Sequence, residues 1–206
     1  MKIITISREF GSGGRELGKR LADILGFNYY DREIITAIAE KHGLCENYVE
    51  KALENHAWQS IPITYRHSFY SDSQYHYSQQ HLLGEQKCII EAIAKQGEDC
   101  VIIGRNADVL LKKYNPFNIF VCADTAAKVR RCKERACEEE KLTEKQIKRK
   151  IRQIEKNRRR TREMISSKKW RDCGTYHMTV NTTDWDIKAL AVSVADMANR
   201  WFEASK

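Results

Sequence analysis

A cluster of glycines between two arginines is the part of this sequence whose residue types point most directly to chemistry. It contains three glycines, a serine and a basic residue on either side: Arg8, Gly11, Ser12, Gly13, Gly14 and Arg15. Glycines let backbone N–H groups approach a phosphate closely, and a helix that begins after them adds the positive end of its dipole. Glycine clusters also make ordinary tight turns, but the position of this one between an apolar segment and a helical pattern favours a phosphate-binding loop.

The loop departs from the strict P-loop pattern, Gly-x-x-x-x-Gly-Lys-[Ser/Thr]. Alignment of residues 6–22 with the strand, loop and helix of nucleotide kinases puts Gly14 at the lysine and Glu16 at the hydroxyl. That lysine normally meets the β- and γ-phosphates, and the hydroxyl normally binds Mg²⁺. We therefore expect Arg15 or Arg8 to replace the lysine. Magnesium would be held largely through phosphates and water, with help from Glu16.

Further motifs follow the loop in order along the chain. They are Tyr30-Asp31-Arg32, Ile103-Gly104-Arg105-Asn106-Ala107-Asp108, Lys169-Trp170-Arg171-Asp172 and Asn181-Thr182. Together with the loop, which reads Gly-Ser-Gly-Gly-Arg-Glu from Gly11 to Glu16, they resemble the cytidylate kinase-like family. One such motif would be weak evidence, but five in register span nearly the whole chain.

The resemblance implies a cytoplasmic phosphotransferase of the nucleoside monophosphate kinase type. ATP with Mg²⁺ would be the phosphoryl donor, and CMP, dCMP or a related small molecule the acceptor. The residues implied to bind the donor are Arg8, Gly11, Ser12, Gly13, Gly14, Arg15, Glu16 and Arg131, with Arg15 also catalytic. Arg131 and Arg135 lie four apart on one helix face and could both contact a nucleotide, although neighbouring glutamates offer ordinary surface partners.

Three residues are expected to bind the acceptor. Asp31 would lie beside the acceptor nucleotide in a protein of this type, although it could also cap the helix that follows it. Arg105 follows the end of a strand, where open parallel sheets bind ligands, and its planar guanidinium suits a phosphate or a base edge. Asp108 is included with Arg105, although it could simply face solvent.

A basic segment near residues 141–171 carries most of the positive charge. It has 14 Lys or Arg against three Glu, a net charge of +11, so that the rest of the chain sums to −3 within the total of +8. Four of its arginines, Arg158, Arg159, Arg160 and Arg162, fall within five positions and repel each other unless anions or water separate them. A lid that closes on phosphates explains them, and the family resemblance assigns catalytic lid roles to Arg158 and Arg160.

Two other functions compete with the kinase. The absent lysine and hydroxyl favour a kinase-fold protein that binds nucleotides as a regulator with little turnover. The basic segment alone would suit a nucleic-acid-binding protein, but such proteins interleave aromatic residues for stacking, and this segment has only Trp170. We therefore expect nucleotides rather than nucleic acid as partners.

The elements that must position these residues alternate between strands and helices. Apolar runs at residues 2–7, 27–30, 100–103, 117–122 and 177–182 predict five strands, and apolar residues at helical spacing follow most of them. Such alternation predicts an α/β fold of the P-loop NTPase type, with a parallel sheet of about five strands and helices on both faces. We expect one domain over residues 1–206, with a helical acceptor-side insertion at about 45–85 and the basic lid at about 141–173.

The composition excludes several classes of protein. No apolar run approaches the ~20 residues that a membrane span requires. The seven cysteines are scattered without a Cys-x-x-Cys pair, which argues against a disulfide framework or a zinc knuckle and favours reduced thiols in a cytoplasm. His56, His67, His76 and His81 lack the spacing of metal ligands, and no metal-binding residue is predicted. The sequence is compatible with a homo-oligomer.

Overall fold

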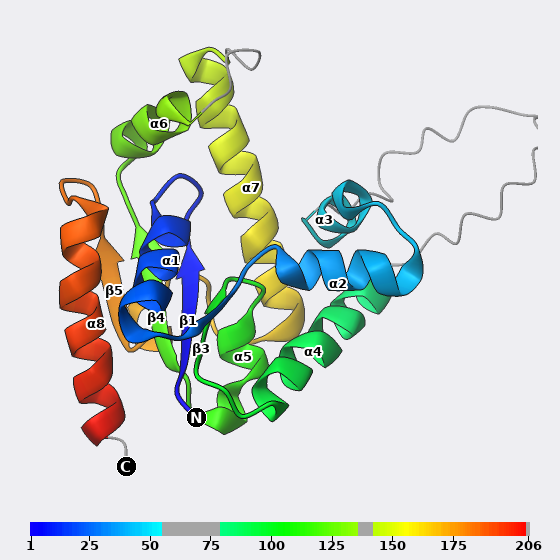
Figure 1. Ribbon diagram of the computed structural model, residues 1–206. Helices are drawn as coiled ribbons and strands as arrows, with labels where there is room; N and C mark the ends of the chain where they lie inside the picture. Colours follow the sequence, from blue (N-terminus) through cyan, green and yellow to red (C-terminus); the bar gives the residue numbers. More distant parts are fainter. Residues whose placement is uncertain (55–78, 136–141, 205–206) are drawn as a thin grey trace, which may run out of the picture.

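A five-stranded parallel sheet forms the centre of the computed structural model, which describes residues 1–54, 79–135 and 142–204 (Figure 1). The strands are β1 (Ile3–Arg8), β2 (Asn28–Tyr30), β3 (Cys100–Ile103), β4 (Phe117–Cys122) and β5 (Met178–Asn181). Their order across the sheet is β2-β3-β1-β4-β5, and every neighbouring pair is parallel. The predicted α/β fold is confirmed, and each strand lies within about a residue of its predicted position.

Helices connect the strands and cover the sheet (Figure 1). They are α1 (Gly14–Leu25), α2 (Glu33–His42), α3 (Glu46–Glu54), α4 (Gln79–Lys95), α5 (Ala107–Leu110), α6 (Thr125–Glu134), α7 (Glu144–Ile165) and α8 (Ile187–Ala204), with short 3-10 turns η2 (Lys112–Tyr114) and η3 (Cys173–Thr175). None of the described helices is both long enough and apolar enough to cross a membrane.

Apolar residues alternate between the two faces of the central strand β1. Ile4 and Ile6 are fully buried in a cluster with residues of α1 and α8, whereas Ile3 belongs to a second cluster with residues of α2, α4 and α5. A parallel strand that is covered on both faces needs apolar residues at successive positions, which is why β1 reads as a continuous Ile/Thr run. The two clusters hold the sheet between two layers of helices.

Local sequence signals account for several helix ends. Gly26 ends α1 in the left-handed region at a φ of 68°, as its position predicts, because glycine adopts this conformation without a Cβ clash. Helix α7 begins with a capping box in which the Thr143 hydroxyl and the Gln146 side chain each accept from the other residue's backbone N–H. The basic segment therefore enters a regular helix of 22 residues.

The expected acceptor-side insertion contains α3 and the first part of α4, which runs on to Lys95, and the expected lid contains α7. His56, His67 and His76 lie outside the described residues. The carboxyl ends of β1, β3 and β4 lie at one edge of the sheet, as parallel pairing requires. This edge brings the glycine loop, Arg105 and the start of α6 together.

Candidate functional site

The glycine loop joins β1 directly to α1. Gly11 and Gly13 adopt positive φ angles of 76° and 81°, and Gly13 caps the helix that begins at Gly14. The fully buried Ser12 donates a hydrogen bond from its hydroxyl to the Glu9 carbonyl at 3.0 Å, which closes the loop on itself. The loop thus lies at the N-terminus of α1, where backbone N–H groups and the helix dipole favour an anion.

The position of the missing lysine is occupied by another side chain. A Cβ placed on Gly14 would lie 2.8 Å from the Cβ of Arg8, so a lysine there could not be accommodated without moving Arg8. Counting along the pattern also corrects the sequence alignment: the hydroxyl position directly follows the lysine position and is Arg15, not Glu16. Glu16 is instead paired with Arg20 and Arg135.

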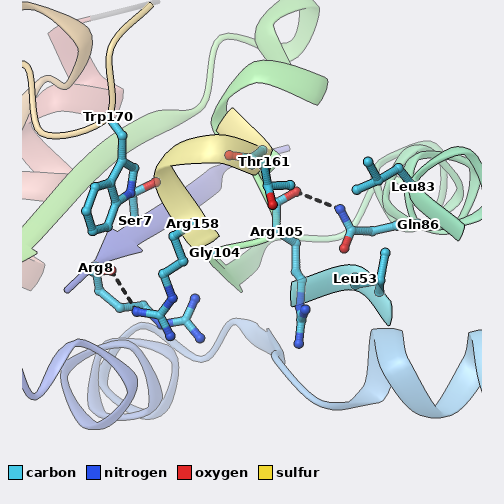
Figure 2. A pocket seen from close by; sticks show the side chains of 11 residues that line it. Ser7, Arg8, Leu53, Leu83, Gln86, Gly104, Arg105, Arg158, Thr161 and Trp170 are labelled. Atoms are coloured by element: carbon cyan, nitrogen blue, oxygen red, sulfur yellow. Dashed lines mark hydrogen bonds between the residues drawn. The ribbon is translucent and has the colours of Figure 1, made fainter. Parts of the chain in front are cut away.

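Two cavities meet at three arginines. A cavity of about 480 Å³ extends along the glycine loop, and a smaller one of about 70 Å³ lies toward α4. Arg8, Arg105 and Arg158 line both. Figure 2 shows these three side chains extending to the same side of the smaller cavity, with Arg158 donating to the Arg8 carbonyl at 2.9 Å. The structure therefore brings together residues that lie up to 150 positions apart.

The larger cavity has a strongly basic lining. Its cationic residues outnumber the two acidic ones, Glu9 and Glu50, and are Arg8, Arg15, Arg105, Arg131, Arg135, Lys150 and Arg158. Burial, followed by repulsion from Arg158, lowers the pKa of the Arg8 guanidinium to about 9, while Asp31 acts in the opposite direction. Arg8 is still charged at neutral pH. An anion placed among these guanidinium groups would relieve their repulsion.

Arg105 is held in a conformation that side chains rarely adopt. Gly104, Arg105 and Asn106 have consecutive positive φ angles of 68°, 56° and 53°. The Gln86 side chain of α4 donates to the Arg105 carbonyl at 3.1 Å and so supports this turn (Figure 2). Non-glycine residues in this region cost about 1–3 kcal/mol each and cluster at functional sites, which supports a functional position for Arg105.

Asp31 pairs with two arginines of the loop. Its carboxylate is buried, forms an ion pair with Arg15 and lies 3.5 Å from Arg8. It does not cap α2, because the residue at that position is Arg32 and the helix start has no side-chain cap. The helix-cap interpretation is therefore wrong. The Arg15 side chain is 56% exposed, whereas Arg8 is 13% exposed.

Arg131 is connected to the glycine loop through Thr182. Its guanidinium donates to the Thr182 hydroxyl at 3.1 Å and to the Thr182 carbonyl at 2.6 Å. The Thr182 hydroxyl in turn donates to the Ser12 carbonyl at 2.6 Å. The Asn181-Thr182 motif thus has a physical role, since it connects α6 to the glycine loop. Arg135, by contrast, lines the larger cavity and pairs with Glu16 of α1, not with the neighbouring glutamates that the sequence offered as partners.

A buried charge network below the loop was not predicted. The Lys128 ammonium lies 2.8 Å from Glu9 and 2.9 Å from Glu155, and Arg171 pairs with both carboxylates. Burial acts to lower the pKa of Lys128, but the hydrogen bonds that its ammonium donates to Glu9 and Glu155 outweigh burial and raise the pKa. The network connects the glycine loop, α6 and α7, so it fixes α7 relative to the glycine loop.

Four predicted site residues line neither cavity: Glu16, Asp31, Arg160 and Asp108. Arg160 is exposed on α7 and belongs to the lining of neither cavity, because a helix turns about 200° between positions 158 and 160. Asp108 neither faces solvent nor lines a cavity. It is buried and paired with Arg162, and these contacts give it a structural role.

Gly104 offers a test of the arginine cluster. A Cβ at this position would lie 1.8 Å from Nη1 of Arg8, and its φ of +68° adds about 1–2 kcal/mol of strain for any other residue. We expect Gly104→Ala to displace the Arg8 guanidinium. Calorimetry on the folded variant should then show ATP binding weakened at least tenfold. Gly84→Ala is the control, because a Cβ at Gly84 in α4 meets no atom within 4 Å. Equal ATP affinities of the two variants would contradict the prediction.

Comparisons with known proteins agree with the predicted fold and family. Residues 3–184 match the cytidylate kinase-like family. Among solved structures, an uncharacterised protein from Eubacterium ventriosum is similar at a TM-score of 0.69 and 23% identity, covering 97% of this chain and 99% of that one. A shikimate kinase from Bacteroides thetaiotaomicron is similar at 0.57 and 14% identity, covering 96% and 98%.

A gluconokinase from Sinorhizobium meliloti has a TM-score of 0.51 at 15% identity, with coverage of 100% and 98%. At these identities the structures show a shared fold, that of P-loop kinases. No curated protein gives a significant match to the sequence. Because the family match spans residues 3–184 of 206, the chain belongs to the cytidylate kinase-like family.

Proposed function

We propose that this protein is a kinase that transfers the γ-phosphoryl group of ATP to CMP, dCMP or a related small phosphorylated acceptor. The observation that carries the proposal is that two cavities share Arg8, Arg105 and Arg158. A donor on the glycine loop and an acceptor in the smaller cavity would meet at these guanidinium groups. Phosphoryl transfer depends mainly on positioning and on neutralising charge, which three convergent arginines can supply.

The donor would occupy the larger cavity. Its phosphates would accept hydrogen bonds from the backbone of residues 11–15 at the start of α1, and the basic lining would balance their charge. Arg131 would then act by holding the loop through Thr182 as well as by facing the nucleotide. These roles retain the predicted donor-binding residues except Glu16, which lines neither cavity and pairs with Arg20 and Arg135.

Magnesium fits this site only through ligands that the nucleotide and water provide. The Glu9 and Glu16 carboxylates pair with basic side chains, and the Ser12 hydroxyl is buried in the loop. Glu50, which lines the larger cavity and lies 4.0 Å from Arg32, is the carboxylate that would remain available to hydrated Mg²⁺. Bound Mg²⁺ would supply charge neutralisation on the β- and γ-phosphates, and it commonly keeps several waters at such sites.

The lining of the smaller cavity favours an acceptor that is already ionised. Among the described residues that line it there is no Asp, Glu or His to remove a proton from a hydroxyl group. A phosphate oxygen needs no base, and the arginines suit it. Gln86, Thr161 and Trp170 add polar groups and one aromatic face that could contact a pyrimidine (Figure 2). The charge of this lining therefore suits the phosphate of a nucleoside monophosphate better than the hydroxyl group of a sugar or shikimate-like alcohol.

Arg8 rather than Arg15 is our choice for the replacement of the P-loop lysine. Arg8 is largely buried, lines both cavities and fills the space beside Gly14, whereas Arg15 is half-exposed and paired with Asp31. Hydrogen bonds to charged groups contribute about 1.5–3 kcal/mol, so we expect Arg8→Ala to weaken ATP binding roughly 10- to 100-fold. Arg15→Ala is the matched variant and should have a smaller effect in the same titration. A larger loss of ATP affinity in Arg15→Ala than in Arg8→Ala would show that Arg15 replaces the P-loop lysine.

The deciding experiment measures ADP formation from ATP with Mg²⁺ and a panel of acceptors. The panel contains CMP, dCMP, UMP and AMP, together with shikimate and gluconate, on which the named fold neighbours act. We expect turnover of CMP or dCMP at about 1–100 per second. Turnover of shikimate or gluconate alone would contradict the inference that the acceptor is a phosphate group.

A regulatory protein that binds nucleotides with little turnover is the second candidate. The observation that favours it is the replacement of both P-loop side chains, with Gly14 at the lysine and Arg15 at the hydroxyl. Calorimetry on the same panel separates the two functions. ATP binding without turnover of any acceptor would support the regulatory function, and neither binding nor turnover would contradict both.

A further inference from the structure

Three residues with metal-binding side chains meet where α2 and α4 pack together, on the acceptor side of the molecule. His42 is the last residue of α2, and His81 and Glu85 lie four apart on the first turns of α4. One ligand atom from each of the three lies within 4.8 Å of the other two. Figure 1 shows the C-terminal end of α2 beside the beginning of α4.

The distances are close to those of a zinc site. An ion equidistant from three atoms separated by at most 4.8 Å would lie no more than about 2.8 Å from each, whereas zinc bonds to histidine and carboxylate are about 2.0–2.2 Å long. His42 Nε2 is already 3.7 Å from Glu85 Oε2, near the ~3.4 Å edge of a zinc tetrahedron. Side-chain rotations that move each ligand atom by less than about 1 Å would complete the coordination.

We propose that His42, His81 and Glu85 bind a Zn²⁺ ion that connects α2 to α4. Two imidazoles and one carboxylate form a ligand set that zinc prefers over magnesium or calcium, which take oxygen ligands. His42 and Glu85 are largely buried, at 13% and 16% side-chain exposure, and His81 is exposed. Three protein ligands leave the fourth position for water or for another group.

Lys41 competes with the ion for the same carboxylate. Its ammonium lies 2.6 Å from Glu85 Oε2 and is 56% exposed, so it can move into solvent when a divalent ion arrives. Without metal, Lys41 balances the charge of Glu85. This competition makes a specific prediction, because removing the ammonium should strengthen zinc binding, whereas removing a ligand should weaken it.

A bound ion would make the packing of α4 against α2 more rigid. Leu83 and Gln86, which line the smaller cavity, lie on the same turns of α4 as His81 and Glu85. Gln86 also supports the strained turn at Arg105. An ion that fixes α4 against α2 would thus hold one wall of this cavity. Zinc binding itself does not depend on the proposed function.

The test titrates the metal-free full-length protein with Zn²⁺ by calorimetry and with Co²⁺ by visible absorption. We expect one Zn²⁺ per chain at this site and a Co²⁺ absorption of the intensity that tetrahedral coordination produces. Loss of an outer-shell partner alone costs zinc sites about 10–100-fold in affinity, so His81→Ala should cost at least about 100-fold. Lys41→Ala should raise the affinity severalfold, and Glu85→Gln should lower it.

Cys173→Ser is the control, because this exposed thiol lies in η3, belongs to neither α2 nor α4 and should not affect the site. Zinc should also raise the melting temperature of the wild type and not that of His81→Ala. If His81→Ala and Glu85→Gln, both folded by circular dichroism, bind Zn²⁺ within threefold of the wild type, the proposal is wrong. An equal loss of affinity in Cys173→Ser would likewise show that the ion binds elsewhere.

Discussion

Replacing Arg158 by alanine is expected to lower the rate of phosphoryl transfer about 10³-fold while changing ATP affinity much less. A lid arginine that meets the transferring phosphoryl group contributes on the order of 10³ to 10⁵ in rate, because charge develops there only in the transition state. Arg158 comes from α7, lines both cavities and donates to the Arg8 carbonyl at 2.9 Å. The measurement is the maximal rate of ADP formation with CMP or dCMP, beside calorimetric ATP binding.

Neighbouring arginines on α7 supply the controls for this prediction. Arg159→Ala removes the same side chain from an exposed position and should leave the rate within about twofold. Arg158→Lys keeps the charge but loses the planar fork, so it should recover part of the rate. A rate for Arg158→Ala near that of the wild type would remove Arg158 from catalysis. A loss in Arg160→Ala as large as that expected for Arg158→Ala would support the lid position that the family resemblance implies for Arg160.

The buried face of α7 could have been predicted from the sequence. Ile147 and Ile151 are buried, and the same face continues through Glu155, Arg158 and Arg162 at intervals of three or four residues. Continuing the apolar stripe would have separated Arg158 from Arg160. Counting the arginines without asking which face of the helix each one occupies could not separate Arg158 from Arg160. The fold was easier to predict, because buried parallel strands appear as uninterrupted apolar runs and need no knowledge of distant partners.

The charge networks could not be predicted in the same way. Lys128 meets Glu9 and Glu155 across separations of 119 and 27 residues, and no periodic pattern connects them. The same holds for His42, which lies near His81 only because α2 packs on α4. A carboxylate directly before a helix, such as Asp31, suggests a helix cap. In the structure it pairs with Arg8 and Arg15 instead, and its position before α2 does not predict these partners.

Breaking the ion pair between Asp108 and Arg162 is expected to destabilise the protein by about 3–5 kcal/mol. Arg162 Nη1 lies 2.6–2.8 Å from the two carboxylate oxygens, and both side chains are almost completely buried, at 1% and 3% exposure. Arg162→Met would leave the Asp108 carboxylate buried without its partner. Because stable domains unfold with only about 5–15 kcal/mol, urea unfolding followed by circular dichroism should show a large shift of the midpoint.

A double variant distinguishes a broken pair from a lost contact. Replacing both partners, as in Asp108→Leu with Arg162→Met, removes both charges, so much of the stability should return, as buried ion pairs can often be replaced by apolar residues. Arg149→Met, at an exposed position of the same helix, is the control and should change stability by no more than about 0.5 kcal/mol. If Arg162→Met is as stable as Arg149→Met, the pair does not hold α7 against α5. Since Asp108 lies three residues after Arg105, loss of this pair should also weaken the support of the cavity that Arg105 and Arg158 share.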